Sequence, residues 1–238
     1  MTTTDNLPAY VGVWSQPGRG RSRNADRFRL LTRNAPLVRE AGRGELFAVF
    51  DGIGSKKLGG EAAQAMCDIL VDFYKQKERY PCSIEGIKAV LEEGNRYIAS
   101  WGQDPGTGKK VGGCAGTVLW ILEESLFFFH VGDTSGVLIQ GQDLQVATEP
   151  HNAQDGALER FFGQGQNLQV DVLEAELSDS DTIVLVSDGV SSVMTLQDQA
   201  GIVKGRPAHI AAKELVRQAE AKGSRDDCTA LVILFEFE

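Results

Sequence analysis

The chain has 238 residues, 42% of them hydrophobic, and its 24 Lys and Arg against 33 Asp and Glu give a net charge of −9. A chain of this length can bury a sizeable core, and we expect residues 1–238 to form one domain. The acidic balance argues against a large nucleic-acid surface, which would need a basic stripe.

Eight apolar runs rich in β-branched or aromatic residues predict strands. They lie at residues 10–14, 27–32, 45–50, 117–122, 126–131, 136–140, 181–187 and 229–236. Three segments have the apolar spacing of amphipathic helices: about 60–75, a segment that begins after 81–83, and about 207–223. Residues 102–113 and 151–169 have the composition of loops, the latter with room for a short helix. This order predicts an α+β fold with mainly antiparallel sheets.

We expect neither a secretory signal nor a membrane span in this sequence. The N-terminal segment lacks the basic and apolar regions of a secretory signal, and no apolar run is long enough to span a membrane. The four cysteines lie far apart and form no CxxC pair, so their spacing gives no support for a zinc site. We therefore expect a cytoplasmic protein that contacts no membrane and acts as a monomer.

Four aspartates flank the best strand candidates. They are Asp51, Asp133, Asp188 and Asp226. Turns favour aspartate, so each position alone is explained by turn chemistry in an α/β binding domain. Together they could instead meet at one edge of the sheets and hold hard metal ions, which prefer oxygen ligands. No GxSxG frame and no P-loop spacing offers a competing catalytic motif.

Seven short motifs occur in the order typical of one enzyme family. They are residues 21–26 (RSRNAD), 50–54 (FDGIG) followed by 60–61 (GE), 116–117 (GT), 130–134 (HVGDT), 148–151 (TEPH), 187–190 (SDGV) and 224–229 (SRDDCT). Each motif is weak by itself, but the ordered set covers nearly the whole chain. It resembles the metal-dependent serine/threonine protein phosphatases of the type-2C (PPM) family, in the compact form found in bacteria.

The resemblance implies an αββα sandwich, with two central antiparallel sheets between helices and a metal site at the sheet edges. It also implies a reaction: phosphoserine and phosphothreonine on proteins would be hydrolysed by a water or hydroxide that bridges two Mg2+ or Mn2+ ions. Such phosphoric monoester hydrolases often oppose a bacterial Ser/Thr kinase in signalling, so phosphoproteins and a cognate kinase system are the expected partners.

The resemblance further assigns roles to single residues. Asp51 would bridge the two ions, with the carbonyl of Gly52 on the second ion. Asp188 and Asp226 would complete the first site, and Asp133 with Asp188 would mark a third, weaker ion. Asp26 would act mainly through a metal-bound water, and it joins Asp51, Asp188 and Asp226 in the expected catalytic set. Arg21 would hold the substrate phosphate.

The sequence departs from the family pattern at several positions. Ala25 stands where the family usually has Glu or Gln, which would weaken the second metal site. Asp227 replaces an asparagine, and we expect it to have a structural role. Residues 141–170 would form the variable flap that sets substrate choice. Ala25 also leaves open an alternative, a pseudophosphatase that binds phosphoproteins without hydrolysing them.

Overall fold

The computed structural model of the protein describes residues 9–178 and 180–235. Within these ranges, ten strands form two five-stranded antiparallel sheets. In spatial order the first sheet contains β1 (Ala9–Gln16), β10 (Cys228–Phe235), β9 (Thr182–Val186), β6 (Ser135–Gln140) and β7 (Asp143–Val146). The second contains β2 (Arg27–Leu31), β3 (Glu45–Gly52), β4 (Cys114–Leu122), β5 (Ser125–Val131) and β8 (Asp171–Glu176).

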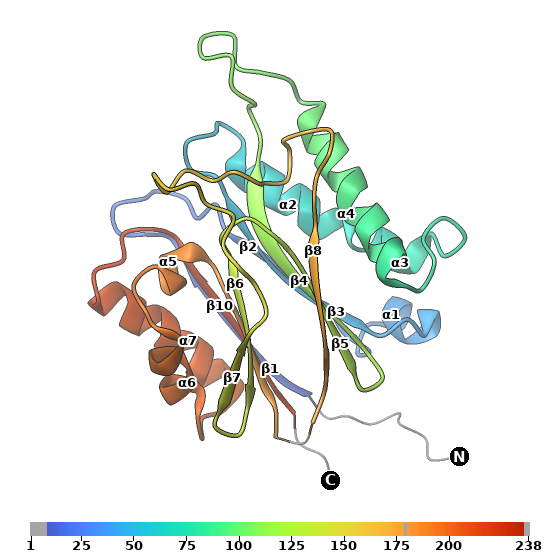
Figure 1. Cartoon of the computed structure of the whole chain (residues 1–238), viewed down its shortest axis with the longest axis vertical. Coiled ribbons are helices and arrows are strands. Elements are labelled where there is room, and N and C mark those ends of the chain that lie inside the picture. The colour runs from blue at the N-terminus through green and yellow to red at the C-terminus, as the bar shows by residue number, and fades with distance from the viewer. Residues whose placement is uncertain (1–8, 179, 236–238) are drawn as a thin grey trace.

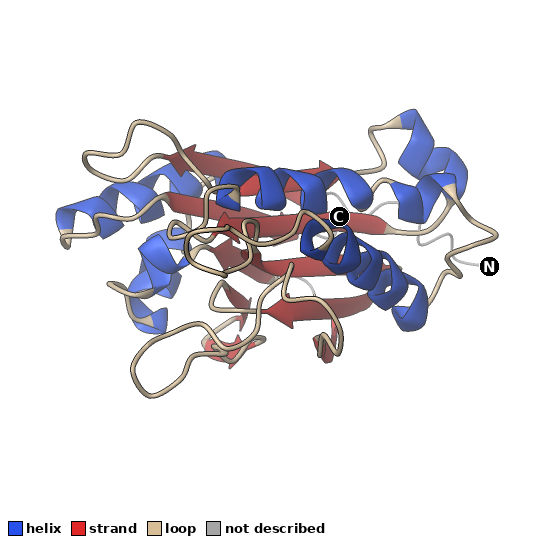
Figure 2. Ribbon diagram, turned by 90° about the horizontal axis from the view of Figure 1, so that it is seen from above, coloured by secondary structure: helices blue, strands red, loops and turns tan. Residues whose placement is uncertain are grey.

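Helices cover the outer faces of both sheets (Figures 1 and 2). Those on the side of the second sheet are α1 (Pro36–Ala41), α2 (Gly59–Ile69), α3 (Asp72–Lys75) and α4 (Ile84–Ala99). Those on the side of the first sheet are α5 (Asp188–Ser191), α6 (Leu196–Val203) and α7 (Ala208–Ala221). None of the described helices is both long and apolar enough to cross a membrane.

Three apolar layers hold the four layers of secondary structure together. Because side chains alternate along a strand, each central strand contributes to two of these layers. Phe50 of β3 packs under the helices, whereas Phe47 and Val49 face the other sheet. In β10, Leu231 joins the same inter-sheet layer, whereas Val232 packs against α7. Both sheets are therefore buried on two sides, which explains their continuous apolar runs.

The predicted α+β fold with an αββα arrangement is confirmed, and all eight predicted strands are present. Residue 236, the predicted end of the last strand, lies outside the described residues. The second and third predicted helices correspond to α4 and α7. The helix predicted over 60–75 is instead divided into α2 and α3, because the Val71 N–H donates to the Asp68 carbonyl only three residues back, at 3.2 Å. This tighter turn interrupts the α-helical hydrogen bonding.

Several short elements have no counterpart in the prediction. They are α1, α5, α6, β7 and β8. The edge strands β7 and β8 alternate polar and half-buried residues, so they lack the apolar run that marked the central strands. The helix α6 carries a local signal, a capping box in which the Thr195 hydroxyl accepts from Asp198 N–H and the Asp198 carboxylate accepts from Thr195 N–H. The described part of residues 151–169 contains no helix.

Candidate active site

Strand ends from both sheets bring the predicted site residues to one region. Asp51 and Gly52 end β3, Asp133 follows β5, and Asp188 begins α5 directly after β9. Asp226 precedes β10, which pairs with β9. The main chain joins these last two segments, because the Ser187 N–H donates to the Thr229 carbonyl at 3.0 Å. Arg21 and Asp26 come from the loop between β1 and β2.

Asp26 is buried at the base of this region, with 2% of its surface exposed. Its Oδ2 accepts hydrogen bonds from the hydroxyls of Ser187 and Thr229, both at 2.7 Å. Its Oδ1 is buried and has no hydrogen-bond partner among the described residues. Burial raises the pKa of Asp26 to about 7, against the opposing effect of the two hydroxyls. This carboxylate is thus held rigidly, with one oxygen left to serve another ligand.

Asp51 and Asp188 form the centre of the carboxylate group. Burial is the main cause that raises the pKa of Asp51 well above its ordinary value, and repulsion from Asp26 and Asp188 adds to it. The pKa of Asp188 is also raised by burial, although a hydrogen bond from the Asp51 carboxyl lowers it in part. Asp188 Oδ1 is the second buried carboxylate oxygen without a partner among the described residues.

Asp133 and Asp226 lie around this centre. Burial, followed by repulsion from Asp188, raises the pKa of Asp133 to about 6. Asp226 repels both Asp133 and Asp188, which places all three carboxylates within electrostatic range. Arg21 bonds to Asp226, with 2.6 Å between Nη2 and Oδ1. The structure therefore brings together every side chain that the sequence singled out for the site.

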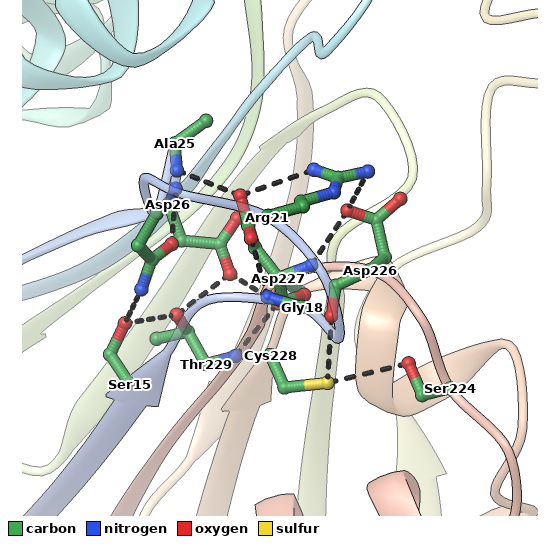
Figure 3. A network of polar contacts seen from close by, with 12 residues as sticks. Ser15, Gly18, Arg21, Ala25, Asp26, Ser224, Asp226, Asp227, Cys228 and Thr229 are labelled. Carbon is green, nitrogen blue, oxygen red and sulfur yellow. Dashed lines mark hydrogen bonds and ion pairs between the residues drawn. The ribbon is translucent and has the colours of Figure 1, made fainter.

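Asp227 anchors the loop that carries Arg21 (Figure 3). Its Oδ1 accepts from the Gly18 N–H at 2.8 Å, and its Oδ2 accepts from the Ala25 N–H at 2.8 Å. The second oxygen also receives Nη1 of Arg21 at 3.2 Å. Asp227 is 1% exposed, so it is a buried anion with three donors. Its carboxylate sets both the path of residues 18–25 and the position of the guanidinium.

Gly52 lets the end of β3 approach α2 closely. A Cβ on Gly52 would lie 2.5 Å from the Gly59 main chain, which leaves no room for a side chain. The next residue of α2, Gly60, faces Ala25, since a Cβ on Gly60 would lie 3.3 Å from the Ala25 Cα. The position of Ala25 is therefore beside the start of α2, at the rim of the carboxylate group.

A hydrogen-bonded chain fixes the segment after Asp133. The Gly132 N–H donates to His151 Nδ1 at 3.0 Å, so the Nε2–H of His151 donates to Asp171, at 2.9 Å. Arg160 binds both oxygens of Asp171, at 2.7 and 3.2 Å. The predicted flap is thus tied at His151 to Gly132, beside Asp133, and at Arg160 to the start of β8.

The donor set fits hard divalent cations. It consists of oxygen atoms, two of them buried without partners, on carboxylates whose mutual repulsion a cation would relieve. No group of three Asp, Glu, His or Cys side chains within the described ranges is arranged to hold an ion by itself. Water and main-chain carbonyls would have to complete the coordination, and Mg2+ commonly keeps several waters.

Sequence reasoning missed three residues that organise the site. Ser187 and Thr229 orient Asp26, and His151 supports the chain before Asp133. Ser187 and Thr229 stand within the motifs at 187–190 and 224–229, so their place beside the aspartates was the available signal.

A groove of about 1440 Å3 opens beside Arg21 and extends along α2.

The sequence matches a known family over most of its length. The model of the family "Protein phosphatase 2C" matches residues 22–226. The relative "Probable protein phosphatase 2C 44" from Oryza sativa subsp. japonica is 27% identical over 226 residues, covering 80% of this chain and 68% of its own. The "Serine/threonine phosphatase stp" of Listeria monocytogenes serovar 1/2a is 22% identical over 210 residues, covering 78% of this chain and 82% of its own.

Solved structures share the fold at low sequence identity. A bacterial serine phosphatase superposes with a TM-score of 0.82 at 17% identity, covering 98% of this chain and 99% of its own. The serine/threonine phosphatase PstP/Ppp of Mycobacterium tuberculosis gives 0.79 at 20% identity, covering 96% and 99%. The catalytic domain of PstP, in complex with two manganese ions, gives 0.78 at 20% identity, covering 98% and 100%.

Proposed function

The chain belongs to the protein phosphatase 2C family, and from that premise we propose that it removes phosphate from phosphoserine and phosphothreonine in proteins at the Asp51–Asp188 centre. The family consists of metal-dependent phosphoprotein phosphatases that use Mg2+ or Mn2+. The observation that carries the proposal is the convergence of buried, mutually repelling carboxylates next to an arginine.

The carboxylates have distinct parts in this proposal. Asp51 would bridge two ions, Asp188 and Asp226 would complete the first site, and the Gly52 carbonyl would serve the second. Asp133 would contribute to an optional third site. When bound, the ions would neutralise the carboxylates, supply a water of lowered pKa for the hydrolysis, and stabilise charge on the phosphoryl group.

Residues of the chain prepare this chemistry. Asp26 accepts two hydroxyl hydrogen bonds through Oδ2, so its Oδ1 is aimed in a fixed direction and can orient a water. Asp227 holds Nη1 of Arg21 near the carboxylates, while Nη2 of Arg21 bonds to Asp226, the more exposed of the two aspartates. A substrate phosphate would compete with Asp226 for that nitrogen, and the fork of the guanidinium would orient it for attack.

The site would act within a signalling pair. We propose that a Ser/Thr kinase supplies the phosphorylated proteins, and that the reaction takes place in the cytoplasm. Both statements rest on the family and on the sequence. Ala25 favours the alternative pseudophosphatase, because the Glu or Gln that the family usually has at this position, beside α2, is replaced by a methyl group.

A turnover assay separates the two candidates. With millimolar Mn2+ the protein should hydrolyse p-nitrophenyl phosphate and a phosphothreonine peptide, and both EDTA and Asp51→Asn should abolish the reaction. Arg21→Ala should mainly raise KM, since it removes a phosphate contact. Circular dichroism of each variant controls for folding. A well-folded wild-type protein that binds the phosphopeptide but shows no turnover would establish the pseudophosphatase instead.

A further inference from the structure

The groove beside Arg21 continues well beyond the carboxylates. Its floor is one face of α2, which lies between β2 and α4 (Figure 1). Glu61, Gln64, Ala65 and Asp68 line it with the spacing of a single helical face, and Asp72 of α3 extends the row. The walls are the loop at 20–25 and the last turns of α4.

The basic and acidic side chains that line the groove come from different segments. The basic residues are Arg21 and Arg23 from the loop before β2, Arg27 at the start of β2, and Lys56 and Lys57 from the turn before α2. The face that α2 and α3 present is acidic, with Glu61 and Asp68 exposed and Asp72 half-buried. Among the described residues no ion pair engages these three carboxylates. The groove therefore has an arginine where a phosphate would bind, and carboxylates without an ion pair on the face formed by α2 and α3.

Aromatic side chains add a second feature on the α4 wall. Tyr97 is 57% exposed, and its ring meets that of Trp101 edge to face with 5.6 Å between centroids. Both residues line the same groove as the acidic side chains of α2. Exposed aromatic faces attract the cationic groups of Lys and Arg, as acidic side chains do.

We propose that this groove binds the substrate segment next to the phosphoresidue and selects phosphoproteins with Lys or Arg a few positions away. The proposal rests on the proposed phosphatase function, because it places the phosphate at Arg21. The part of α2 from Glu61 to Asp68 and the tighter turn that leads to Asp72 in α3 together span about 16 Å. An extended chain covers that distance in about five residues. Arg or Lys four or five positions from the phosphothreonine should therefore reach Asp68 and Asp72.

The test compares phosphothreonine peptides that differ only in that position. Each peptide carries a pair of Arg, Ala or Glu residues at the fourth and fifth positions, either before or after the phosphothreonine. At low salt the kcat/KM for one Arg peptide should exceed that of its Ala counterpart by about three- to tenfold, and the Glu peptide should be poorest. The preference should shrink as salt rises, because the carboxylates are exposed.

Two double variants locate the preference. In Asp68→Asn/Asp72→Asn the ratio of Arg-peptide to Ala-peptide kcat/KM should fall to below about twofold. Glu78→Gln/Glu92→Gln removes two exposed carboxylates outside the groove lining and should retain the wild-type ratio. Equal kcat/KM for all peptides, or a preference that survives in the first variant, would overturn the inference.

Failure of the proposed function gives a different result. If neither p-nitrophenyl phosphate nor any peptide is hydrolysed, the catalytic proposal fails, and fluorescence anisotropy with the same labelled peptides then tests the groove. Tighter binding of the Arg peptide, lost in Asp68→Asn/Asp72→Asn, would support the groove without turnover. Equal binding of all peptides would overturn it.

Discussion

Removal of the Asp227 carboxylate tests how the Arg21 loop is held. Asp227→Ala deletes three hydrogen bonds and leaves the Gly18 and Ala25 N–H groups without their acceptor. An unsatisfied buried donor costs about 1–3 kcal/mol. The Ala25 group is only partly buried, and loss of the Asp227 charge relieves repulsion on Asp26. We therefore expect the free energy of unfolding to fall by about 2–4 kcal/mol.

Two further variants give an ordered series. In Asp227→Asn the amide oxygen can still accept from one N–H, but the amide nitrogen faces the other donor, so we expect a loss of about 1–2 kcal/mol. Arg21→Ala leaves both main-chain donors paired and removes a contact that is partly exposed, so it should cost less than about 1 kcal/mol. Both Arg21→Ala and Asp227→Ala should raise KM, because the first removes the guanidinium and the second releases it from its position.

Urea unfolding monitored by circular dichroism, with EDTA present in every sample, measures the series. The slope of the transition should be unchanged, so that shifts in midpoint report stability. KM for p-nitrophenyl phosphate with Mn2+ supplies the second readout. An Asp227→Ala protein within about 0.5 kcal/mol of the wild type would refute the assignment, since ordinary surface substitutions have effects of that size.

Three other perturbations follow from the structure. Gly189→Ala should lower the free energy of unfolding by more than about 2 kcal/mol, because the added Cβ would lie 2.0 Å from a backbone carbonyl oxygen. Gly201→Ala, in open space on α6, should leave the free energy of unfolding unchanged or slightly higher. Urea unfolding that shows equal shifts in stability for the two variants would contradict this. Burial lowers the pKa of His130 from 6.5 to about 4, so the folded state favours the neutral imidazole and this contribution to stability is lost as pH falls from 6.5 to 4. His130→Gln should therefore reduce the acid-induced loss of stability by up to about 3 kcal/mol. The same dependence of unfolding free energy on pH in the variant and the wild type would argue against it. Arg160→Ala removes both contacts to Asp171 and should speed amide hydrogen exchange in residues 151–165. Exchange rates equal to those of the wild type would contradict this.

Local sequence patterns predicted the central strands and the long helices, because burial of one or both faces of an element leaves its mark within that element's own sequence. The apolar runs of β3, β9 and β10 reflect burial on both faces, and the amphipathic spacing of α4 and α7 reflects one covered face. The short edge strands β7 and β8 were not predicted, since half-exposed strands lack that signal. The division between α2 and α3 depends on a single tighter turn, which apolar periodicity does not reveal.

The sequence by itself determined which aspartates to examine, through ordered motifs and their positions at strand ends. Tertiary structure alone decided what each carboxylate contacts. Asp227 binds Gly18 across 209 positions of sequence, and Asp26 binds Thr229 across 203. The acidic floor of the groove likewise depends on which face of α2 stays open beside α4. The physical reason is that burial and hydrogen-bond partners depend on distances between remote segments, which only the packed sheets and helices define.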